Sequence, residues 1–294
     1  TNEWEKLKTV ILGTSENMNW SKTDEEFKSS AKRIGITPGP VPNHIIYDTE
    51  KALKNFQIQL ESLGVKVLRP KKLDYVKLDG IGNYCPRDTA ITIGNKVILA
   101  PTIWRSRRKE WDSMKHYFGS NVHTVEDPRV IFDAANIIRC NRDIIYLVSY
   151  SGNEYGADWL EDFLGPEYRV HRLRNVYKGM HLDTTIVPLR EGLVLLNAGR
   201  MKETDIPKFM RSWDKIWIAA DEIVNDSNST KATSQWIGMN LLSYDENLVF
   251  CDGKQKNIIN KLKKYKINTI DIDLPHAKYL MGGHHCVTLD LTRG

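Results

Sequence analysis

The chain has 294 residues, with 42 Lys and Arg residues against 37 Asp and Glu residues, and a formal net charge of +5. A hydrophobic content of 41% argues against disorder, and a chain of this length can bury a sizeable core. The longest apolar runs are strand-sized, whereas a helix that crosses a bilayer needs about 20 apolar residues. We therefore expect neither a membrane span nor a membrane partner.

The cysteines and the N-terminal residues indicate a reducing compartment. The four cysteines form no CxxC pair, and the first residues lack the basic start and apolar stretch of a secretory signal. We therefore expect a cytoplasmic protein. The positive charge is mild and is not interleaved with aromatic residues, so no nucleic-acid partner is expected.

Hydrophobic periodicity predicts the same unit four times after Asp88: a hairpin of two strands, a helix and a third strand. The predicted helices cover residues 106–117, 155–164, 204–211 and 255–265. An irregular stretch is expected over residues 224–231.

The two ends of the chain supply the parts of a fifth unit. A final strand at residues 286–291 can join a strand at 9–12, a helix at 49–63 and a strand at 65–68. Repeated units, one of which is completed by joining the two ends of the chain, predict a five-fold pseudosymmetric α/β propeller of ββαβ units. Residues 1–294 would then form a single domain. The alternative is a plain α/β domain in which strands and helices merely alternate.

Residues capable of chemistry stand near the start of the first strand in unit after unit. They are Asp88, Asp133, His181 with Asp183, Thr233 with Ser234, and Cys286. In a closed ring these positions would converge on one central cavity.

Cys286 follows Gly282 and Gly283, whose missing side chains allow close approach of the backbone and a tight entry to the strand. This position suits a nucleophile, although a buried structural cysteine is the commoner fate of a single thiol. A zinc site made of His284, His285 and Cys286 is less favoured, since adjacent strand residues point to opposite faces.

His181 and Asp183 are two residues apart, which places them on one face of a strand. Asp133 stands beside two small residues, Ala134 and Ala135. A cysteine, a histidine and a carboxylate recur in nucleophilic catalysis because a third group must orient the base. An ordinary surface ion pair is the alternative for the His181–Asp183 pair.

Several motifs, in the same order, resemble those of the arginine:glycine and arginine:inosamine-phosphate amidinotransferases. They are Pro86-Arg87-Asp88-Thr89, the segments at 100–107, 132–139 and 179–183, then Arg200, Trp236, Met239-Asn240, and Gly282-Gly283-His284-His285-Cys286. Asn136 replaces an aspartate of the glycine-type enzymes, and Met281 replaces a glycine.

The resemblance implies a pentein-like five-fold propeller and a role for each site residue. Cys286 would be the nucleophile, His181 the general acid and base, and Asp133 the carboxylate that orients His181. The expected substrate-binding residues are Asp88 and Asp183 for the guanidinium, Arg200 for the α-carboxylate, and Thr233, Ser234 and Met180 lining the pocket.

The implied activity is transfer of the amidino group of L-arginine to an amine through a covalent amidino-cysteine, without metal or organic cofactor. Glycine is the preferred acceptor, giving guanidinoacetate and L-ornithine, with lysine and inosamine phosphate as alternatives. Family members are often homodimers. The competing hypotheses are a hydrolytic deiminase or dihydrolase, in which water attacks the same intermediate, and a guanidino-binding module without activity.

Overall fold

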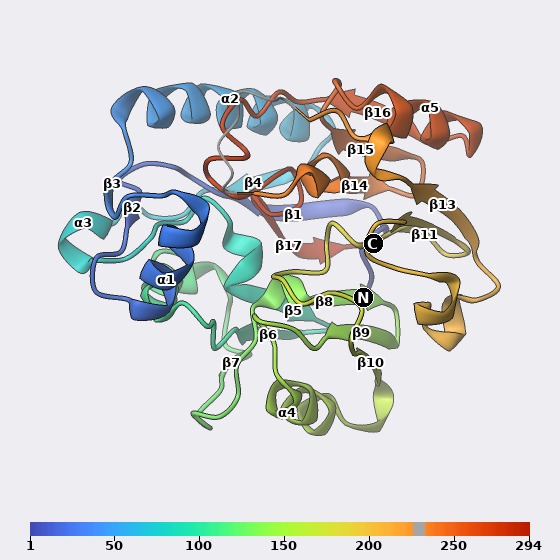
Figure 1. Cartoon of the computed structure of the whole chain (residues 1–294), viewed down its shortest axis with the longest axis horizontal. Coiled ribbons are helices and arrows are strands. Elements are labelled where there is room, and N and C mark those ends of the chain that lie inside the picture. The colour runs from blue at the N-terminus through green and yellow to red at the C-terminus, as the bar shows by residue number, and fades with distance from the viewer. Residues whose placement is uncertain (226–232) are drawn as a thin grey trace.

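In the computed structural model, which describes residues 1–225 and 233–294, strands form five three-stranded sheets and one two-stranded ladder among the described residues (Figure 1). The central strand of each three-stranded sheet is antiparallel to one neighbour and parallel to the other. The α/β class is confirmed. The irregular stretch expected at 224–231 falls almost wholly on residues 226–232, which lie outside the described residues.

The sheets follow one another along the chain. They are β5 (Ala90–Ile93), β6 (Lys96–Leu99) and β7 (Val122–Thr124); β8 (Ile137–Cys140), β9 (Asp143–Leu147) and β10 (Arg169–Leu173); β11 (Ile186–Arg190), β12 (Leu193–Asn197) and β13 (Asp214–Ile218); β14 (Leu242–Asp245), β15 (Leu248–Cys251) and β16 (Asn268–Asp271); and β17 (Thr288–Arg293), β1 (Leu7–Leu12) and β4 (Lys66–Leu68). The two-stranded ladder pairs β2 (Asn19–Trp20) with β3 (Gly39–Pro40).

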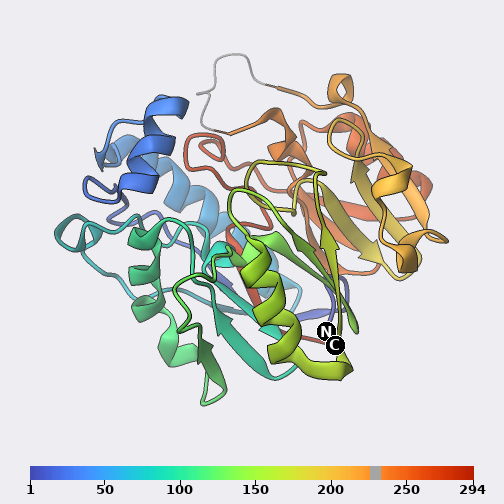
Figure 2. The same ribbon diagram turned by 60° about the horizontal axis from the view of Figure 1, so that its bottom comes forward.

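The fifth sheet joins the two ends of the chain, as the sequence predicts. Strand β17 runs antiparallel to β1, with Leu7 opposite Arg293 and Leu12 opposite Thr288. Strand β4 then pairs with the other edge of β1 in parallel. Figures 1 and 2 both show the N- and C-terminal ends side by side.

Helices α2 (Asn43–Ser62), α4 (Glu154–Leu164) and α5 (Lys256–Lys264) connect the second and third strands of their units, as expected. In Figure 1 they lie at the periphery of the molecule, outside the sheets. Helix α4 begins where the side chain of Asn153 accepts the N–H of Gly156, and it ends at Gly165. In the described part of the chain, none of the helices has the length and apolar character needed to cross a membrane.

The predicted α-helices at 106–117 and 204–211 are wrong in type, because both segments are 3₁₀-helical. The first contains η2 (Arg105–Ser113) and η3 (Lys115–Tyr117). Arg107, Glu110 and Ser113 are all buried, and a helix with three residues per turn places these positions on one face. The second is divided into η6 (Glu203–Asp205) and η7 (Lys208–Met210) by Pro207, which has no N–H to continue a helix.

Two further helices, α1 (Glu25–Ile34) and α3 (Tyr75–Leu78), were not expected from the sequence. Asp24 caps the start of α1 by accepting the N–H of Phe27, and Gly35 ends it at φ +77°. The remaining short 3₁₀-helices are η1 (Pro86–Asp88), η4 (Ala134–Asn136), η5 (Gly165–Glu167), η8 (Ala220–Glu222) and η9 (Gln235–Met239).

Among the described residues, buried apolar side chains gather into five clusters, and each cluster joins two of the three-stranded sheets. Ile138 of β8, for example, shares a cluster with Ile186 of β11, and Val187 of β11 shares the next with Val249 of β15. The other three clusters join β1 to β14, β17 to β5, and β5 to β8. Each sheet therefore packs against two others.

We predict that the contact between α2 and β15 makes a large contribution to stability. Phe56 of α2 is fully buried, and its ring lies 5.0 Å from Phe250 and 5.9 Å from His284, centroid to centroid. Phe56→Ala should lower the free energy of unfolding in urea by about 3–5 kcal/mol. Ile58→Ala is the control on the same helix, because Ile58 is 50% exposed, and its effect should stay within about 0.5 kcal/mol. Equal effects would contradict this packing.

Candidate active site

The segments that precede the first strands of four units, β5, β11, β14 and β17, line one cavity. This cavity has a volume of about 430 Å³. Its lining includes the following predicted site residues: Asp88, Met180, His181, Asp183, Arg200, Thr233, Ser234 and Cys286. Asp133 lies behind His181 and hydrogen-bonds to it. The structure therefore brings the predicted residues together, except that Asp133 does not line the cavity.

The backbone at these residues differs from the strand that the sequence predicts. Strand β11 begins only at Ile186, and β17 only at Thr288. His181 has φ +66°, in the left-handed region, and Asp183 lies in the turn that follows it. The expected shared strand face of His181 and Asp183 is therefore wrong. Cys286 lies in a turn, in which the N–H of Val287 donates to the carbonyl of Gly283.

Asn240 holds the turn that carries Cys286. Its Oδ1 accepts the N–H groups of His285 at 2.9 Å and of Cys286 at 3.0 Å, while its Nδ2 lies 3.2 Å from the Cys286 sulfur. A Cβ atom on Gly283 would lie only 2.8 Å from that of Asn240, so the glycine is required here. The sequence motif contains Asn240 but does not reveal this role.

The Cys286 thiol is buried, and its pKa is raised well above the ordinary value. A hydrogen bond with the Cys85 thiol is the largest cause, followed by burial and by the negative charges of Asp183 and Asp88. The sulfur lies 3.2 Å from Asp183 Oδ2, as a donor to it. Without a bound cation, Cys286 is therefore a thiol.

His181 is held by carboxylates. Its Nε2 lies 2.9 Å from Asp133 Oδ2, and its Nδ1 lies 3.7 Å from Asp88 Oδ1. Burial by itself lowers the pKa of His181, but the charges of Asp88, Asp133 and Asp183 outweigh burial and raise the pKa to about 9. His181 is consequently an imidazolium at neutral pH, able to act as an acid.

Asp88 has a hydrogen-bonded cationic partner on one oxygen, while its other oxygen lies 3.7 Å from His181 Nδ1. Arg107 donates to its Oδ2 and is itself held by Glu110, at 2.9 Å from Nε and 3.0 Å from Nη2. The other oxygen, Oδ1, is buried without any hydrogen bond. A buried carboxylate oxygen that accepts no hydrogen bond at a cavity wall is suited to a cationic ligand.

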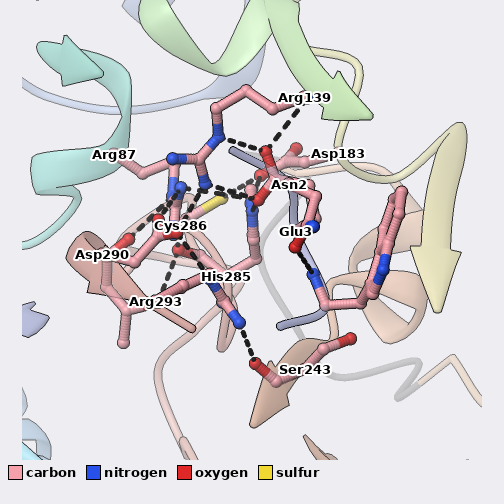
Figure 3. Close-up of polar contacts among 12 residues, drawn as sticks. Asn2, Glu3, Arg87, Arg139, Asp183, Ser243, His285, Cys286, Asp290 and Arg293 are labelled. Carbon is pink, nitrogen blue, oxygen red and sulfur yellow. Dashed lines mark hydrogen bonds and ion pairs between the residues drawn. The ribbon is translucent and has the colours of Figure 1, made fainter. Parts of the chain in front are cut away.

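The other carboxylate at the cavity, Asp183, is paired with His285. His285 Nδ1 lies 2.9 Å from Asp183 Oδ2. Both residues are labelled in Figure 3. Burial alone raises the pKa of Asp183, but the hydrogen bond and charge of His285, together with His181, lower it well below the ordinary range. Asp183 is thus ionised.

Arg200 supplies a positive charge to the same cavity. It donates to the hydroxyls of Thr184 at 2.8 Å, Thr185 at 2.9 Å and Ser234 at 3.0 Å. Its guanidinium lies 3.9 Å from the centre of the Tyr177 ring. Among the described residues, no carboxylate lies within salt-bridge distance of Arg200, so its charge is available to an anionic ligand. Thr233 donates to the carbonyl of Lys278.

Several residues of this site were not assigned a role from the sequence. Arg107 and His285 lie inside the quoted motifs, but only the structure shows that each pairs with a carboxylate. Ser30 and Arg33 come from α1, the helix that the sequence analysis missed. The caps Asp24 and Gly35 are the signal that could have revealed that helix.

The chemistry of the cavity is that of covalent catalysis on a cation. The cavity is lined by a thiol, an imidazolium and two carboxylates, each with one oxygen that accepts no hydrogen bond from the part of the chain that the structure describes. Arg200 adds a positive charge. Within residues 1–225 and 233–294, no cluster of three or more His, Cys, Asp or Glu side chains is arranged to hold a metal ion.

No protein-family model matches the chain. The chain is 34% identical to inosamine-phosphate amidinotransferase 1 of Streptomyces glaucescens, over 99% of this chain and 95% of the relative. It is 30% identical to the L-arginine:L-lysine amidinotransferase of Pseudomonas savastanoi pv. phaseolicola, over 99% of this chain and 93% of the relative.

The solved structure of the inosamine-phosphate amidinotransferase of Streptomyces griseus superposes with a TM-score of 0.88 at 35% identity, covering 99% of this chain and 95% of that one. A dimethylarginine dimethylaminohydrolase, at 16% identity, has a TM-score of 0.67 over 97% of this chain and all of the other, which shows a common pentein fold. The chain belongs to the amidinotransferase family. It is a transferase that acts on small molecules.

We predict that Asp133 raises the pKa of His181. Asp133→Asn replaces a hydrogen-bonded negative charge by a neutral amide, so the pKa of His181 should fall from about 9 by about one unit or more. An NMR titration of the imidazole measures this change, with Asp127→Asn, an exposed aspartate, as the control. An unchanged midpoint in Asp133→Asn would show that Asp133 does not hold the proton of His181.

Proposed function

We propose that this amidinotransferase moves the amidino group of L-arginine to an acceptor amine through a covalent amidino-Cys286. The observation that carries the proposal is the convergence of the Cys286 thiol, the His181–Asp133 pair and the carboxylates Asp88 and Asp183 on one cavity. A guanidinium is planar, cationic and weakly electrophilic, so it must be held by negative charge while a nucleophile attacks its carbon.

The distribution of charge around the cavity supports L-arginine as the donor. Asp88 Oδ1 lacks a protein donor, and Asp183 uses its Oδ2 for His285 and Cys286. The guanidinium would bind between these two carboxylates. Arg200, surrounded by hydroxyl groups, is suited to the α-carboxylate. The name of the L-arginine:L-lysine relative is consistent with this donor.

In the first half-reaction the Cys286 thiolate attacks the guanidinium carbon and forms a carbon–sulfur bond. The bond from that carbon to the side-chain nitrogen of arginine then breaks, and His181 protonates the departing nitrogen. L-ornithine leaves, and a thiouronium remains on Cys286. Asp133 positions His181 throughout through the 2.9 Å contact with Nε2.

In the second half-reaction the acceptor amine attacks the thiouronium carbon. His181, which became neutral when it protonated ornithine, takes the proton of this amine. The carbon–sulfur bond breaks, and the Cys286 thiolate and the guanidino product separate. His181 therefore serves as acid and then as base, in agreement with a raised pKa that returns the proton to the ring after each turnover.

The donor itself supplies the charge that activates Cys286. In the free protein, burial and the carboxylates keep the sulfur protonated. A guanidinium between Asp88 and Asp183 adds a positive charge where those carboxylates act on the sulfur, which lowers the pKa of the thiol. The thiol proton then passes to solvent, because His181 is already protonated. Nucleophile and donor are thereby coupled.

The outer part of the cavity supports an acceptor amine that also carries a negative charge. Arg33 of α1 and Lys178 line this part, and no described carboxylate pairs with either side chain. The relatives are named for inosamine phosphate, L-lysine and glycine, each of which bears an amine and an anionic group. Glycine meets this requirement and is the first acceptor to test.

The closed five-fold propeller is part of the same proposal, supported by five sheets of one construction and by clusters that join each sheet to two others. The four cysteines are all free, which supports a cytoplasmic location. A single domain over residues 1–294 and a homodimer stay predictions of the family resemblance.

We predict that L-arginine without an acceptor leaves one amidino group on Cys286 and releases one L-ornithine per protein. Intact-protein mass spectrometry and amino-acid analysis measure both products. Cys286→Ala should abolish adduct and ornithine, whereas Cys251→Ala, in β15, should retain them. Citrulline without ornithine would show hydrolysis instead of transfer, and turnover by Cys286→Ala would exclude the covalent route.

We predict that Arg33 contributes to acceptor binding. Because a charge-assisted hydrogen bond is worth about 1.5–3 kcal/mol, Arg33→Gln should raise the KM of an anionic acceptor roughly tenfold or more, without changing the KM of L-arginine. Lys32→Gln, on the exposed neighbouring position of α1, is the control. Steady-state assays with glycine, L-lysine and inosamine phosphate measure the effect. An equal response of Arg33→Gln and Lys32→Gln would contradict an anion site at Arg33.

A further inference from the structure

A chain of buried charged groups links the N-terminal segment to the donor carboxylate Asp183 (Figure 3). Glu3, His285 and Asp183 are exposed by only 6%, 7% and 3%. His285 lies between the two acids, with Nδ1 2.9 Å from Asp183 Oδ2 and Nε2 3.4 Å from Glu3 Oε2. The reaction proposed above uses Asp183 but assigns no role to the other two.

Both ring nitrogens of His285 have a carboxylate neighbour. A neutral imidazole has one N–H and one bare nitrogen, and a bare nitrogen that faces a carboxylate oxygen is repelled by it. Both ring nitrogens of His285 face a carboxylate oxygen. Hydrogen bonds at both nitrogens therefore require the imidazolium.

We propose that Glu3 holds His285 as an imidazolium, and that this cation positions Asp183 for binding of the donor guanidinium. Both are positioning residues, since neither reaches the reacting atoms. The inference rests on the proposed function, because Asp183 binds a donor only in that reaction.

Glu3 is itself rigidly placed. Its two oxygens accept Arg139 Nε at 2.7 Å and Nη2 at 2.8 Å, and Oε1 also accepts the backbone N–H of Arg139 at 3.2 Å. Asn2 Oδ1 accepts the N–H groups of Trp4 and Glu5, which fixes the turn around Glu3. Burial opposes ionisation of Glu3, but Arg139 and His285 keep its pKa well below the ordinary value.

The imidazolium has two effects on Asp183. Its N–H donates to Oδ2 and, together with the Cys286 thiol on the same oxygen, fixes the plane of the carboxylate, which leaves Oδ1 for the donor. Its charge keeps Asp183 ionised beside a buried thiol. The surrounding ionisable groups are His181 and Cys286 on the Asp183 side, and Arg87, Arg139, Asp290 and Arg293 on the Glu3 side.

Four variants separate the charge of His285 from its hydrogen bonds. An asparagine side chain places an amide N–H near the Nδ1 position, and a glutamine side chain places one near Nε2. His285→Asn therefore preserves a donor to Asp183 but removes the charge, whereas His285→Gln also loses that donor. Glu3→Gln keeps the shape of Glu3 without its charge. Glu5→Gln, in the same segment, is the matched control.

The first measurement is kcat/KM for L-arginine as a function of pH. Loss of the adjacent cation raises the pKa of Asp183, so in His285→Asn the acid limb should move up by about one pH unit or more. His285→Gln should show the larger loss at neutral pH, of about tenfold or more. Glu3→Gln removes one of the two carboxylates that face His285, so its kcat/KM for L-arginine at neutral pH should fall below that of the wild type and of Glu5→Gln.

The second measurement needs no turnover. Nitrogen-15 NMR of labelled histidine, assigned with His285→Asn, should show His285 as an imidazolium in the wild type and as a neutral imidazole in Glu3→Gln at the same neutral pH. A neutral His285 in the wild type would overturn the proposal. The proposal would also be overturned if the variants at His285 and Glu3 lowered only the melting temperature and kept the same pH profile as Glu5→Gln. Failure of every protein to release ornithine would refute the proposed function while leaving the NMR result to decide the protonation state.

Discussion

The site depends on concentrating negative charge next to a buried thiol. Asp88 and Asp183 act directly on Cys286, while Asp133 and these two act on His181. In a medium of low dielectric constant this charge keeps Cys286 protonated and charges His181. A cationic substrate changes the balance, because it places positive charge among the same carboxylates. In the free protein Cys286 is therefore a thiol, with its pKa raised by a hydrogen bond with a neighbouring thiol, by burial and by these carboxylates.

The fold places a basic side chain within hydrogen-bond distance of each of these carboxylates. Asp88 pairs with Arg107, Asp133 with His181, and Asp183 with His285. Such pairs make buried carboxylates tolerable, since an isolated buried charge is very costly. In each pair, the carboxylate and the basic side chain belong to different segments of the chain. The positions of η1, η2 and the turns before β8, β11 and β17 therefore matter more to the chemistry than the sheets themselves.

The sequence predicted those features that depend on local patterns. Alternating apolar residues located the strands, and the Gly94 turn between β5 and β6 was expected from glycine and asparagine. It did not predict that residues 105–113 form a 3₁₀-helix, because the pairing of Arg107 with Glu110 and Asp88 depends on tertiary contacts. For the same reason the partnership of Glu3 with His285 was invisible, since 282 positions separate them along the chain. Candidate residues could be named, but their partners could not.

The central claim, that a bound guanidinium converts the Cys286 thiol into a thiolate, can be measured without turnover. The ultraviolet thiolate absorbance of the wild type, minus that of Cys286→Ala, is followed against pH at a low, non-denaturing concentration of guanidinium chloride. Urea, which is planar but neutral, serves as the matched ligand, with sodium chloride to equalise ionic strength. The account predicts that the thiolate appears at distinctly lower pH with guanidinium than with urea. The same midpoint in both would contradict it.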